Sequence, residues 1–424
     1  MSTHVPSIII GGGQAGLSIG YCLKEHGINS IIFEKHKIAH AWRSQRWDSF
    51  CLVTPNWQCQ LPGFHYNGSD PDGFMVKPDI VKFIEDYSAS FNAPVKEGVE
   101  VTNVKRLGKQ YCVSTSIGEY TADSVIVATG GYHTPIIPRI AERLPEGITQ
   151  IHSSVYKNPD RLPDGAVLVV GSGQSGCQIA EDLHFAGREV YLSVGSAPRS
   201  PRMYRGKDVV DWLDRMGYYD TPIDSYDNPG QVRKKTNHYL TGRDGGREIN
   251  LRKLALDGMT LAGRLQRIES STIYFKRDLH KNLDGADAVA SSIKATIDRF
   301  IADSEIDTPA ESPESAIAAP PELDSLDCKL ANISTVIWST GFHTNFSWID
   351  VPVFNGDGYP VHDRGVTSQE GLYFIGLPWL YTWGSGRMSG VARDARHLAD
   401  YIAARQKVSR SDSDCSANIV ALGS

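Results

Sequence analysis

Two copies of one pattern constrain this chain more than any other feature: an apolar run, a glycine-rich turn and then a helical stretch. The first copy runs from Ser7–Ile10 into Gly11-Gly-Gly-Gln-Ala-Gly16. The second runs from Ala166–Val170 into Gly171-Ser-Gly-Gln-Ser-Gly176. A strand, a tight turn and a helix in this order are typical of a dinucleotide-binding α/β unit. The repeat therefore predicts an α/β protein with two Rossmann-like domains.

Each glycine of such a turn meets a different physical need. The first makes the tight turn, the second lets the backbone approach a pyrophosphate, and the third lets the helix pack on its strand. The diphosphate then lies at the helix N-terminus, where free N–H groups and the helix dipole favour negative charge. The residues expected to hold the two diphosphates are Gly11, Gly13, Gln14, Ala15 and Gly16, and then Gly171, Gly173, Gln174, Ser175 and Gly176.

The residues after each turn distinguish the two nucleotides. The strand after the first turn ends at Glu34, whose carboxylate accepts hydrogen bonds from an adenosine ribose and repels a 2′-phosphate. This suits FAD or NAD. The corresponding strand of the second copy ends without an acid, and Arg199 and Arg202 follow it. Because guanidinium groups bind phosphate bidentately, the pair predicts NADPH, although both arginines can also be ordinary loop charges.

Composition excludes several other classes of protein. The net charge is −6, without a long basic run, so neither nucleic acid nor an anionic membrane is an expected partner. No apolar stretch approaches the roughly 20 residues that span a bilayer. A strand is expected from Val5, which leaves no room for a signal peptide, so a cytoplasmic protein is predicted. The seven cysteines form no C-x-x-C pair, and neither a metal site nor a redox dithiol is expected.

The order of the apolar runs predicts one domain inserted into another. Strand-like segments return late in the chain, after the second glycine turn. We therefore expect residues 1–150 and 331–405 to form the FAD domain and residues 151–330 to form the NADPH domain. The Ser- and Asp-rich residues 406–424 are expected to form a flexible tail.

Together with Val127-Ala-Thr-Gly-Gly-Tyr-His-Thr-Pro-Ile-Ile-Pro138, the two turns resemble the flavin-containing monooxygenase group of class B flavoprotein monooxygenases. That group includes Baeyer–Villiger, N-hydroxylating and auxin-forming members. The resemblance covers about residues 5 to 405. The tail of the family fingerprint is recognisable at His152-x-x-x-Tyr156, but its upstream Phe and Gly positions are not matched.

The resemblance implies roles for further residues. Ala41-Trp42-Arg43 and Thr54-Pro-Asn56 are similar to segments that lie along the flavin in the family. Asn56 falls where relatives have a polar residue near the reactive flavin carbon, although Asn after Pro55 is also a common turn residue. Arg387 offers a cation near the flavin or a plain surface charge. The other cofactor contacts that the resemblance implies are Val101, Thr129, Gly130 and Gly376.

The activity that the resemblance implies is an NADPH- and O2-dependent oxygenation. NADPH reduces FAD, O2 forms a C4a-(hydro)peroxyflavin, and one oxygen passes to a small organic substrate by N-, S- or Baeyer–Villiger-type oxygenation. Aromatic residues at 42, 47, 57, 379, 381 and 383 can line a flat pocket or belong to the core. An NADPH oxidase, a pyridine nucleotide–disulfide reductase and a nucleotide sensor are the alternatives. A homodimer is common among relatives.

Overall fold

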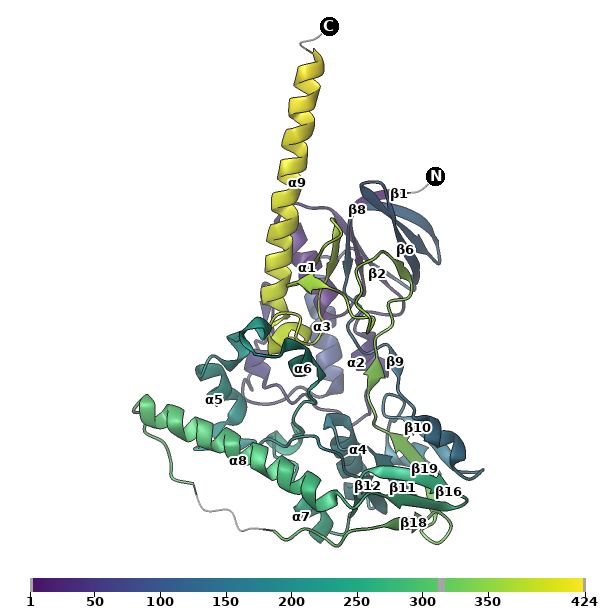
Figure 1. The fold of residues 1–424 in the computed structure, drawn as a ribbon. Helices are drawn as coiled ribbons and strands as arrows, with labels where there is room; N and C mark the ends of the chain where they lie inside the picture. The colour runs from purple at the N-terminus through teal and green to yellow at the C-terminus, as the bar shows by residue number, and fades with distance from the viewer. Residues whose placement is uncertain (1–2, 312–316, 422–424) are drawn as a thin grey trace.

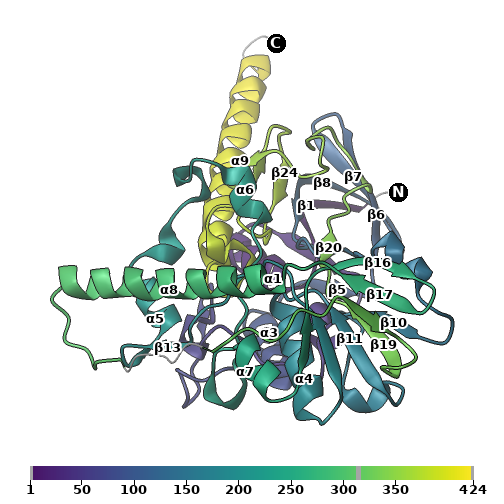
Figure 2. The same ribbon diagram turned by 60° about the horizontal axis from the view of Figure 1, so that its bottom comes forward.

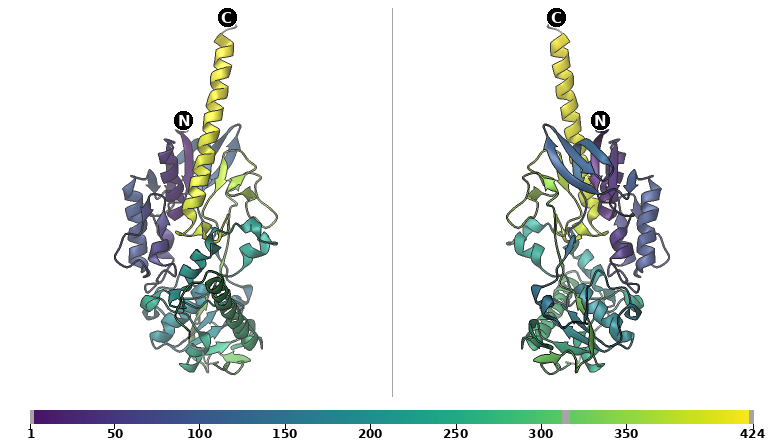
Figure 3. Two further views of the ribbon diagram at one scale, coloured as in Figure 1. Left: turned by 90° about the vertical axis from the view of Figure 1, so that its left-hand side faces the viewer. Right: turned by 90° about the vertical axis from the view of Figure 1, so that its right-hand side faces the viewer.

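The chain forms two lobes joined by two crossings (Figures 1 and 3). The computed structural model describes residues 3–311 and 317–421, with the backbone alone for residues 408–421. The upper lobe in Figure 1 holds the first glycine turn and the last helix, and the lower lobe holds the second turn. The prediction of an α/β fold with two Rossmann-like units is confirmed.

The first lobe is built on a sheet whose parallel strands run in the order β5-β2-β1-β8-β24. An antiparallel meander, β6-β7-β8, continues from β8. Its strands are β1 (Thr3–Ile10), β2 (Ser30–Glu34), β5 (Val95–Glu97), β6 (Val101–Leu107), β7 (Gln110–Thr115), β8 (Gly118–Val127), β21 (Ile349–Asp350), β22 (His362–Asp363), β23 (Val366–Thr367) and β24 (Leu372–Phe374). Its helices are α1 (Gln14–Glu25), α2 (His40–Ser44), α3 (Lys77–Ser90) and α9 (Val391–Ala421).

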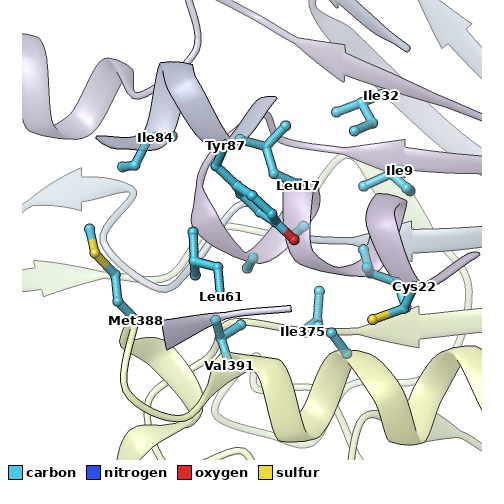
Figure 4. Packing of buried hydrophobic residues seen from close by; sticks show 14 of the residues in the cluster. Ile9, Leu17, Cys22, Ile32, Leu61, Ile84, Tyr87, Ile375, Met388 and Val391 are labelled. Carbon is cyan, nitrogen blue, oxygen red and sulfur yellow. The ribbon is translucent and has the colours of Figure 1, made fainter. Parts of the chain in front are cut away.

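Strand β1 is apolar on both sides because both faces of the sheet are covered. Ile9 packs with α1, α3 and α9, whereas its neighbours Ile8 and Ile10 pack toward the meander on the other face. Figure 4 shows Ile9, Leu17 and Val391 in the first of these clusters. The buried strand thereby places the glycine turn at the carboxyl edge of the sheet, where ligands bind in this fold class.

The second lobe repeats the arrangement with an all-parallel sheet in the order β10-β19-β11-β12-β15. A three-stranded antiparallel sheet packs on one face, and α4, α7 and α8 pack on the other. The strands are β10 (Thr149–His152), β11 (Ala166–Val170), β12 (Val190–Ser193), β13 (Met203–Tyr204), β14 (Lys207–Asp208), β15 (Thr260–Ala262), β16 (Leu265–Glu269), β17 (Thr272–Phe275), β18 (Ser325–Asp327) and β19 (Ile333–Trp338). The helices are α4 (Gln174–Phe185), α5 (Val209–Arg215), α6 (Pro229–Lys234), α7 (Leu251–Leu256) and α8 (Leu279–Asp303).

The late strand β19 corrects one predicted boundary. Residues 331–405 were expected to belong wholly to the first domain, yet β19 lies between β10 and β11 in the second sheet. The physical reason is the pseudo-repeat itself. A Cβ on Gly11 would lie 2.7 Å from the carbonyl oxygen of Ala128, and one on Gly171 would lie 2.6 Å from that of Ser339. The end of β19 therefore closes the second turn as the end of β8 closes the first.

The chain leaves and re-enters the first lobe along paired segments. Strand β9 (Thr134–Pro135) on the outward path pairs antiparallel with β20 (Phe342–His343) on the return path. Two further short strands, β3 (Gln60–Leu61) and β4 (Phe64–His65), form a hairpin in the first lobe. The second domain thus runs from about β10 to the end of β19.

Two long helices extend beyond the sheets of their lobes. Helix α8 is long, and its C-terminal half packs on α5 through Ile297 and Trp212, away from the second sheet (Figure 2). Helix α9 continues to Ala421 through the stretch expected to be a flexible tail, and it projects from the first lobe (Figure 1). Neither Gly nor Pro occurs in 391–421 to end the helix. No helix in the described part of the chain is long and apolar enough to cross a membrane.

Candidate active site between two dinucleotide folds

The first glycine turn has the geometry that a diphosphate needs. Gly11 has a φ of +112°, and a Cβ on Gly16 would lie 1.9 Å from the carbonyl oxygen of Gly11. Gly13 is the N-cap of α1, and a Cβ there would meet nothing within 4 Å. The turn is therefore closed behind Gly16 and open in front of Gly13, where the free N–H groups of α1 begin.

Glu34 is held against this turn. One carboxylate oxygen accepts a hydrogen bond from the Gly12 N–H at 2.7 Å, and the other accepts from the His36 N–H at 2.8 Å. A carboxylate oxygen can accept more than one hydrogen bond, so both retain capacity for a ribose hydroxyl. The arrangement suits an adenosine ribose without a 2′-phosphate.

Residues far apart in sequence gather around the start of α1. The Gln14 carboxamide donates to the Gly386 carbonyl oxygen at 3.4 Å and accepts from the Trp42 indole N–H at 3.2 Å. Gly376 has a φ of +78°, and a Cβ on it would lie 2.5 Å from the Cβ of Ala15. The late part of the chain thus packs against the start of α1.

The other predicted flavin contacts differ in their distance from the first turn and in their exposure to solvent. Thr129 and Gly130 follow β8 after Ala128, whose carbonyl oxygen faces Gly11. Val101 begins β6 and is half-buried. Arg43 forms an ion pair with Glu85, with 2.5 Å between a guanidinium nitrogen and a carboxylate oxygen. Because that ion pair is largely exposed, Arg43 is engaged at the surface of the lobe.

The second turn repeats the geometry with different chemistry. A Cβ on Gly176 would lie 1.8 Å from the carbonyl oxygen of Gly171. The second turn is bonded to the residues that follow β12, because the Ser172 hydroxyl accepts a hydrogen bond from the Gly195 N–H at 2.9 Å. Gly173 faces Thr236, with 3.7 Å between its ideal Cβ position and the threonine methyl carbon.

The start of α4 carries the remaining predicted residues of this turn. The Gln174 carboxamide donates to the Leu240 carbonyl oxygen at 2.5 Å, and Ser175 is exposed. The segment from Thr236 to Leu240 therefore lies beside the second turn. Sequence reasoning did not include this segment, because nothing in its composition marks it as close to the glycines.

Arg199 and Arg202 correct the prediction of a 2′-phosphate site. Arg199 is 7% exposed and bonds to Asp287 at 2.6 Å and Glu248 at 3.1 Å. Arg202 is 2% exposed, forms an ion pair with Asp208 at 2.8 Å and stacks on Phe74. Burial lowers the pKa of Arg202, and the Asp208 carboxylate opposes that shift. Arg199 therefore links two parts of the second lobe, and Arg202 also contacts Phe74 of the first lobe.

Replacing Arg199 by Met is therefore expected to affect stability and not nucleotide choice. Removing one partner of a buried ion pair costs about 3–5 kcal/mol of unfolding free energy. Urea unfolding measures this loss, and the ratio of kcat/KM for NADPH to that for NADH measures the preference. Asp287→Asn serves as the matched partner variant. A selective loss of NADPH use at unchanged stability would contradict this assignment.

Asn56 is likewise engaged in structure. Its side chain is 4% exposed, and its carboxamide donates to the Asp70 carbonyl oxygen and accepts from the Met75 N–H, both at 2.9 Å. The carboxamide ties the loop of residues 70–75 to the first lobe. The structure thus favours a structural role for Asn56, because both ends of its carboxamide are engaged within the protein. Nothing in the geometry supports a catalytic hydrogen bond from this residue.

Replacing Asn56 by Ala is expected to lower the free energy of unfolding by about 1–3 kcal/mol, because a buried N–H is left without its acceptor. Chemical denaturation measures the loss. Asn67→Ala, at an exposed position of the same lobe, is the control and should be neutral. Unchanged stability in Asn56→Ala together with a loss of coupling between NADPH oxidation and product would restore the catalytic role.

Arg387 lies between the lobes and close to both turns. Its guanidinium stacks on Trp383, with 3.6 Å to the ring centroid, and donates to the Asn237 side-chain oxygen at 2.9 Å. Its backbone neighbour Gly386 bonds Gln14 of the first turn. Arg387 is thus a half-buried cation and not a plain surface charge.

Comparison with known proteins agrees with this arrangement. Residues 8–216 match the pyridine nucleotide-disulphide oxidoreductase family. An uncharacterized CzcO-like oxidoreductase of Geobacillus kaustophilus is 35% identical over 95% of this chain and 99% of its own. A probable indole-3-pyruvate monooxygenase of Arabidopsis thaliana is 32% identical over 42% of this chain and 43% of its own. The structure of a flavin monooxygenase variant of Stenotrophomonas maltophilia superposes with a TM-score of 0.66 at 19% identity, covering 95% and 99% of the two chains.

The fold and the two turns define an oxidoreductase that uses a flavin and a nicotinamide nucleotide. The chain belongs to the CzcO-like oxidoreductases.

The described cysteine side chains lie inside the two lobes. The six cysteines whose side chains the structure describes are buried and unpaired. Burial raises the pKa of the Cys51 thiol to about 11 and that of the Cys59 thiol to about 12. Thiols in such surroundings are poor nucleophiles at neutral pH.

Proposed function

We propose that the protein is an FAD- and NADPH-dependent monooxygenase that transfers one oxygen atom of O2 to a small organic substrate. The overall reaction consumes substrate, O2, NADPH and a proton and yields oxygenated substrate, NADP⁺ and water. The observation that carries the proposal is the pair of unequal turns, one bonded to Glu34 and the other ending at Gly195 without an acid.

The residues present fit the two nucleotides differently. FAD fits the first site, because Glu34 is oriented for a plain ribose and Gly13 leaves the helix N-terminus open. Arg199 and Arg202 do not support NADPH in the second site, because acids engage both of them. The support comes from residues 193–195, which carry no carboxylate that would repel a 2′-phosphate. The names of the Arabidopsis relative and the Stenotrophomonas structure support monooxygenation. We place the enzyme in the cytoplasm, where NADPH is generated.

A flavin held at the first turn would supply the redox chemistry, namely hydride acceptance and activation of O2. The protein holds and orients the two nucleotides and shields the reaction from water. Gln14 and Trp42 bond to each other at the start of α1, whereas Arg387 bonds to Asn237, next to the Thr236 that faces the second turn. The structure brings these residues together from four separate parts of the chain.

Anaerobic mixing with NADPH, followed by oxygenated buffer, tests the proposal. We expect a yellow protein that bleaches faster with NADPH than with NADH. Reoxidation with a suitable organic substrate should give oxygenated product in proportion to the NADPH consumed. Hydrogen peroxide as the sole product with every substrate would indicate an oxidase, and a protein that never bleaches would indicate a nucleotide sensor.

A further inference from the structure

Three fully buried polar side chains, Thr382, Ser385 and Asp394, lie together at the start of α9, and each is at most 1% exposed. Thr382 and Ser385 form a capping box. The Ser385 hydroxyl accepts hydrogen bonds from the Tyr381 and Thr382 N–H groups, both at 3.0 Å. Asp394 belongs to the first turn of α9 and faces Ser385. The cluster therefore ties α9 to the segment of residues 381–387.

Asp394 is a carboxylate that the fold buries at a cost. Neither of its oxygens forms a close hydrogen bond with any described residue, and Nε of Arg364 lies 3.8 Å from Oδ1. Burial raises the pKa of Asp394 to about 6, and the Ser385 hydroxyl and the Arg364 and Arg393 guanidinium groups oppose that shift. A buried charge that is only loosely paired lowers the stability of a fold. Stability therefore does not explain why this residue is an acid.

Segment 381–387 reaches from this cluster to both nucleotide turns. The Gly386 carbonyl oxygen accepts a hydrogen bond from Gln14 of the first turn at 3.4 Å. The Arg387 guanidinium donates to Asn237, which follows the threonine that faces the second turn, at 2.9 Å. A displacement of this segment therefore changes contacts at both turns.

The inserted domain also packs on this segment. The Ile223 N–H donates to the Tyr381 carbonyl oxygen at 2.7 Å, and the ring of Tyr219 lies 4.9 Å from that of Trp383. The guanidinium of Arg393, on α9, donates to the Tyr219 carbonyl oxygen at 3.2 Å. The position of the segment thus contributes to how the two lobes meet beside the candidate site.

We propose that Asp394 is a positioning residue whose negative charge holds segment 381–387 in the arrangement that serves both turns. The charge attracts Arg364, whose guanidinium lies 4.0 Å from the centroid of the Tyr381 ring. It also faces the Ser385 hydroxyl, whose proton remains to be donated because its oxygen accepts from two N–H groups. Protonation of the carboxylate weakens both attractions. This inference rests on the proposed function, because it concerns the approach of the two nucleotides.

The charge has opposite effects on global and local stability. Global unfolding returns the carboxylate to water, so the charge lowers the stability of the whole fold. Movement of segment 381–387 alone removes the interactions with Ser385 and Arg364 while Asp394 stays inside the lobe on α9, so the charge stabilises the local arrangement. Asp394→Asn should therefore stabilise the protein and loosen the segment. Removal of an ordinary structural ion pair would weaken both.

Urea unfolding of the FAD-loaded full chain from about pH 5 to about pH 8 measures the global effect. The pKa of Asp394 is raised in the fold, so its contribution to stability is full below the unfolded-state value and is lost as the pH rises through about 6. The urea midpoint of Asp394→Asn should thus exceed that of wild type at about pH 8. The difference should shrink as the pH falls.

Hydrogen exchange, measured by mass spectrometry on peptides that cover segment 381–387, reports the local effect. At about pH 8 the Tyr381 and Thr382 amides should exchange at least about 10-fold faster in Asp394→Asn than in wild type. Reduction of the flavin by saturating NADPH should slow about 10- to 100-fold at unchanged FAD content. Arg364→Met should move the pH dependence of wild type to higher pH, because it removes a cation that favours the charged carboxylate.

Other charged groups lie around this cluster, on α9, in the β22–β23 hairpin and in the inserted domain: Arg393, Arg396, His397, Asp400, Asp363 and Asp220. Among these, His397 has an ordinary pKa near neutrality. Burial lowers the pKa of His397, and Arg364 adds to that shift. His397→Gln is therefore the control, and it should leave the pH dependence of the urea midpoint and the exchange of both amides unchanged.

A lower urea midpoint of Asp394→Asn at every pH, or failure of this variant to fold, would assign Asp394 to structural pairing and overturn the proposal. Unchanged exchange of the two amides would overturn it as well. A wild type that NADPH does not reduce would contradict the proposed function instead. Because unfolding and hydrogen exchange need no turnover, they test Asp394 in either case.

Discussion

Replacing Gly13 by Val should give a folded protein that contains no flavin. Gly13 has φ −87° and ψ −173°, an extended conformation that valine adopts readily, and its Cβ would meet nothing within 4 Å. The folded chain therefore accommodates the side chain. Its methyl groups, however, occupy the space through which a diphosphate approaches the N-terminus of α1. We expect FAD affinity to fall by at least about 100-fold, equivalent to about 3 kcal/mol.

The flavin absorbance per protein, after purification and after incubation with excess FAD, measures this effect. Circular dichroism and the thermal midpoint show whether the fold is retained. Gly16→Ala is a useful contrast, because its Cβ would lie 1.9 Å from the Gly11 carbonyl oxygen, so this variant should fail to fold normally. Full FAD content in Gly13→Val would show that the first turn does not hold the flavin.

Replacing Gly173 by Val should give the reciprocal phenotype, a yellow protein that NADPH cannot reduce. Gly173 has φ −68° and ψ −179°, and its Cβ would lie 3.7 Å from the Thr236 methyl carbon, an ordinary contact. The side chain is thus tolerated by the fold but blocks approach of the second diphosphate to α4. The Kd for NADPH is expected to rise at least about 100-fold.

Stopped-flow reduction at increasing NADPH concentration measures the change, and dithionite should still bleach the flavin fully. Together the two valine variants form a matched pair, since each is the control for the other. Loss of FAD from Gly173→Val with normal NADPH binding in Gly13→Val would reverse the assignment of the two sites. Unchanged reduction of Gly173→Val would place the nicotinamide nucleotide elsewhere.

Local sequence predicted the parts of the site that lie within one unit of the repeat. The turn at Gly11–Gly16 and the carboxylate of Glu34 belong to one strand–turn–helix–strand segment, so their spacing alone places them together. The same reasoning located Gly171–Gly176. The prediction of a second domain also followed, although the boundary at β19 did not. A strand segment carries no signal for the sheet it joins when both sheets bury apolar strands on both faces.

Local sequence did not predict the partners of the charged residues. Arg199 and Arg202 stand at the right distance after the second strand, but their partners Asp287 and Asp208 come from elsewhere in the fold. An arginine in sequence does not show whether an acid will neutralise it.

The sequence by itself determined the class of this protein, two dinucleotide folds with a Glu34-bonded first site, because these features depend on contacts within about 30 residues of chain. Only the tertiary structure decided which polar side chains remain available for ligands. It buried Asn56, Arg199 and Arg202 in internal bonds and left Arg387 between the two turns. The physical reason is that a side chain's free hydrogen-bonding capacity is set by its neighbours in space, which the order of residues does not specify.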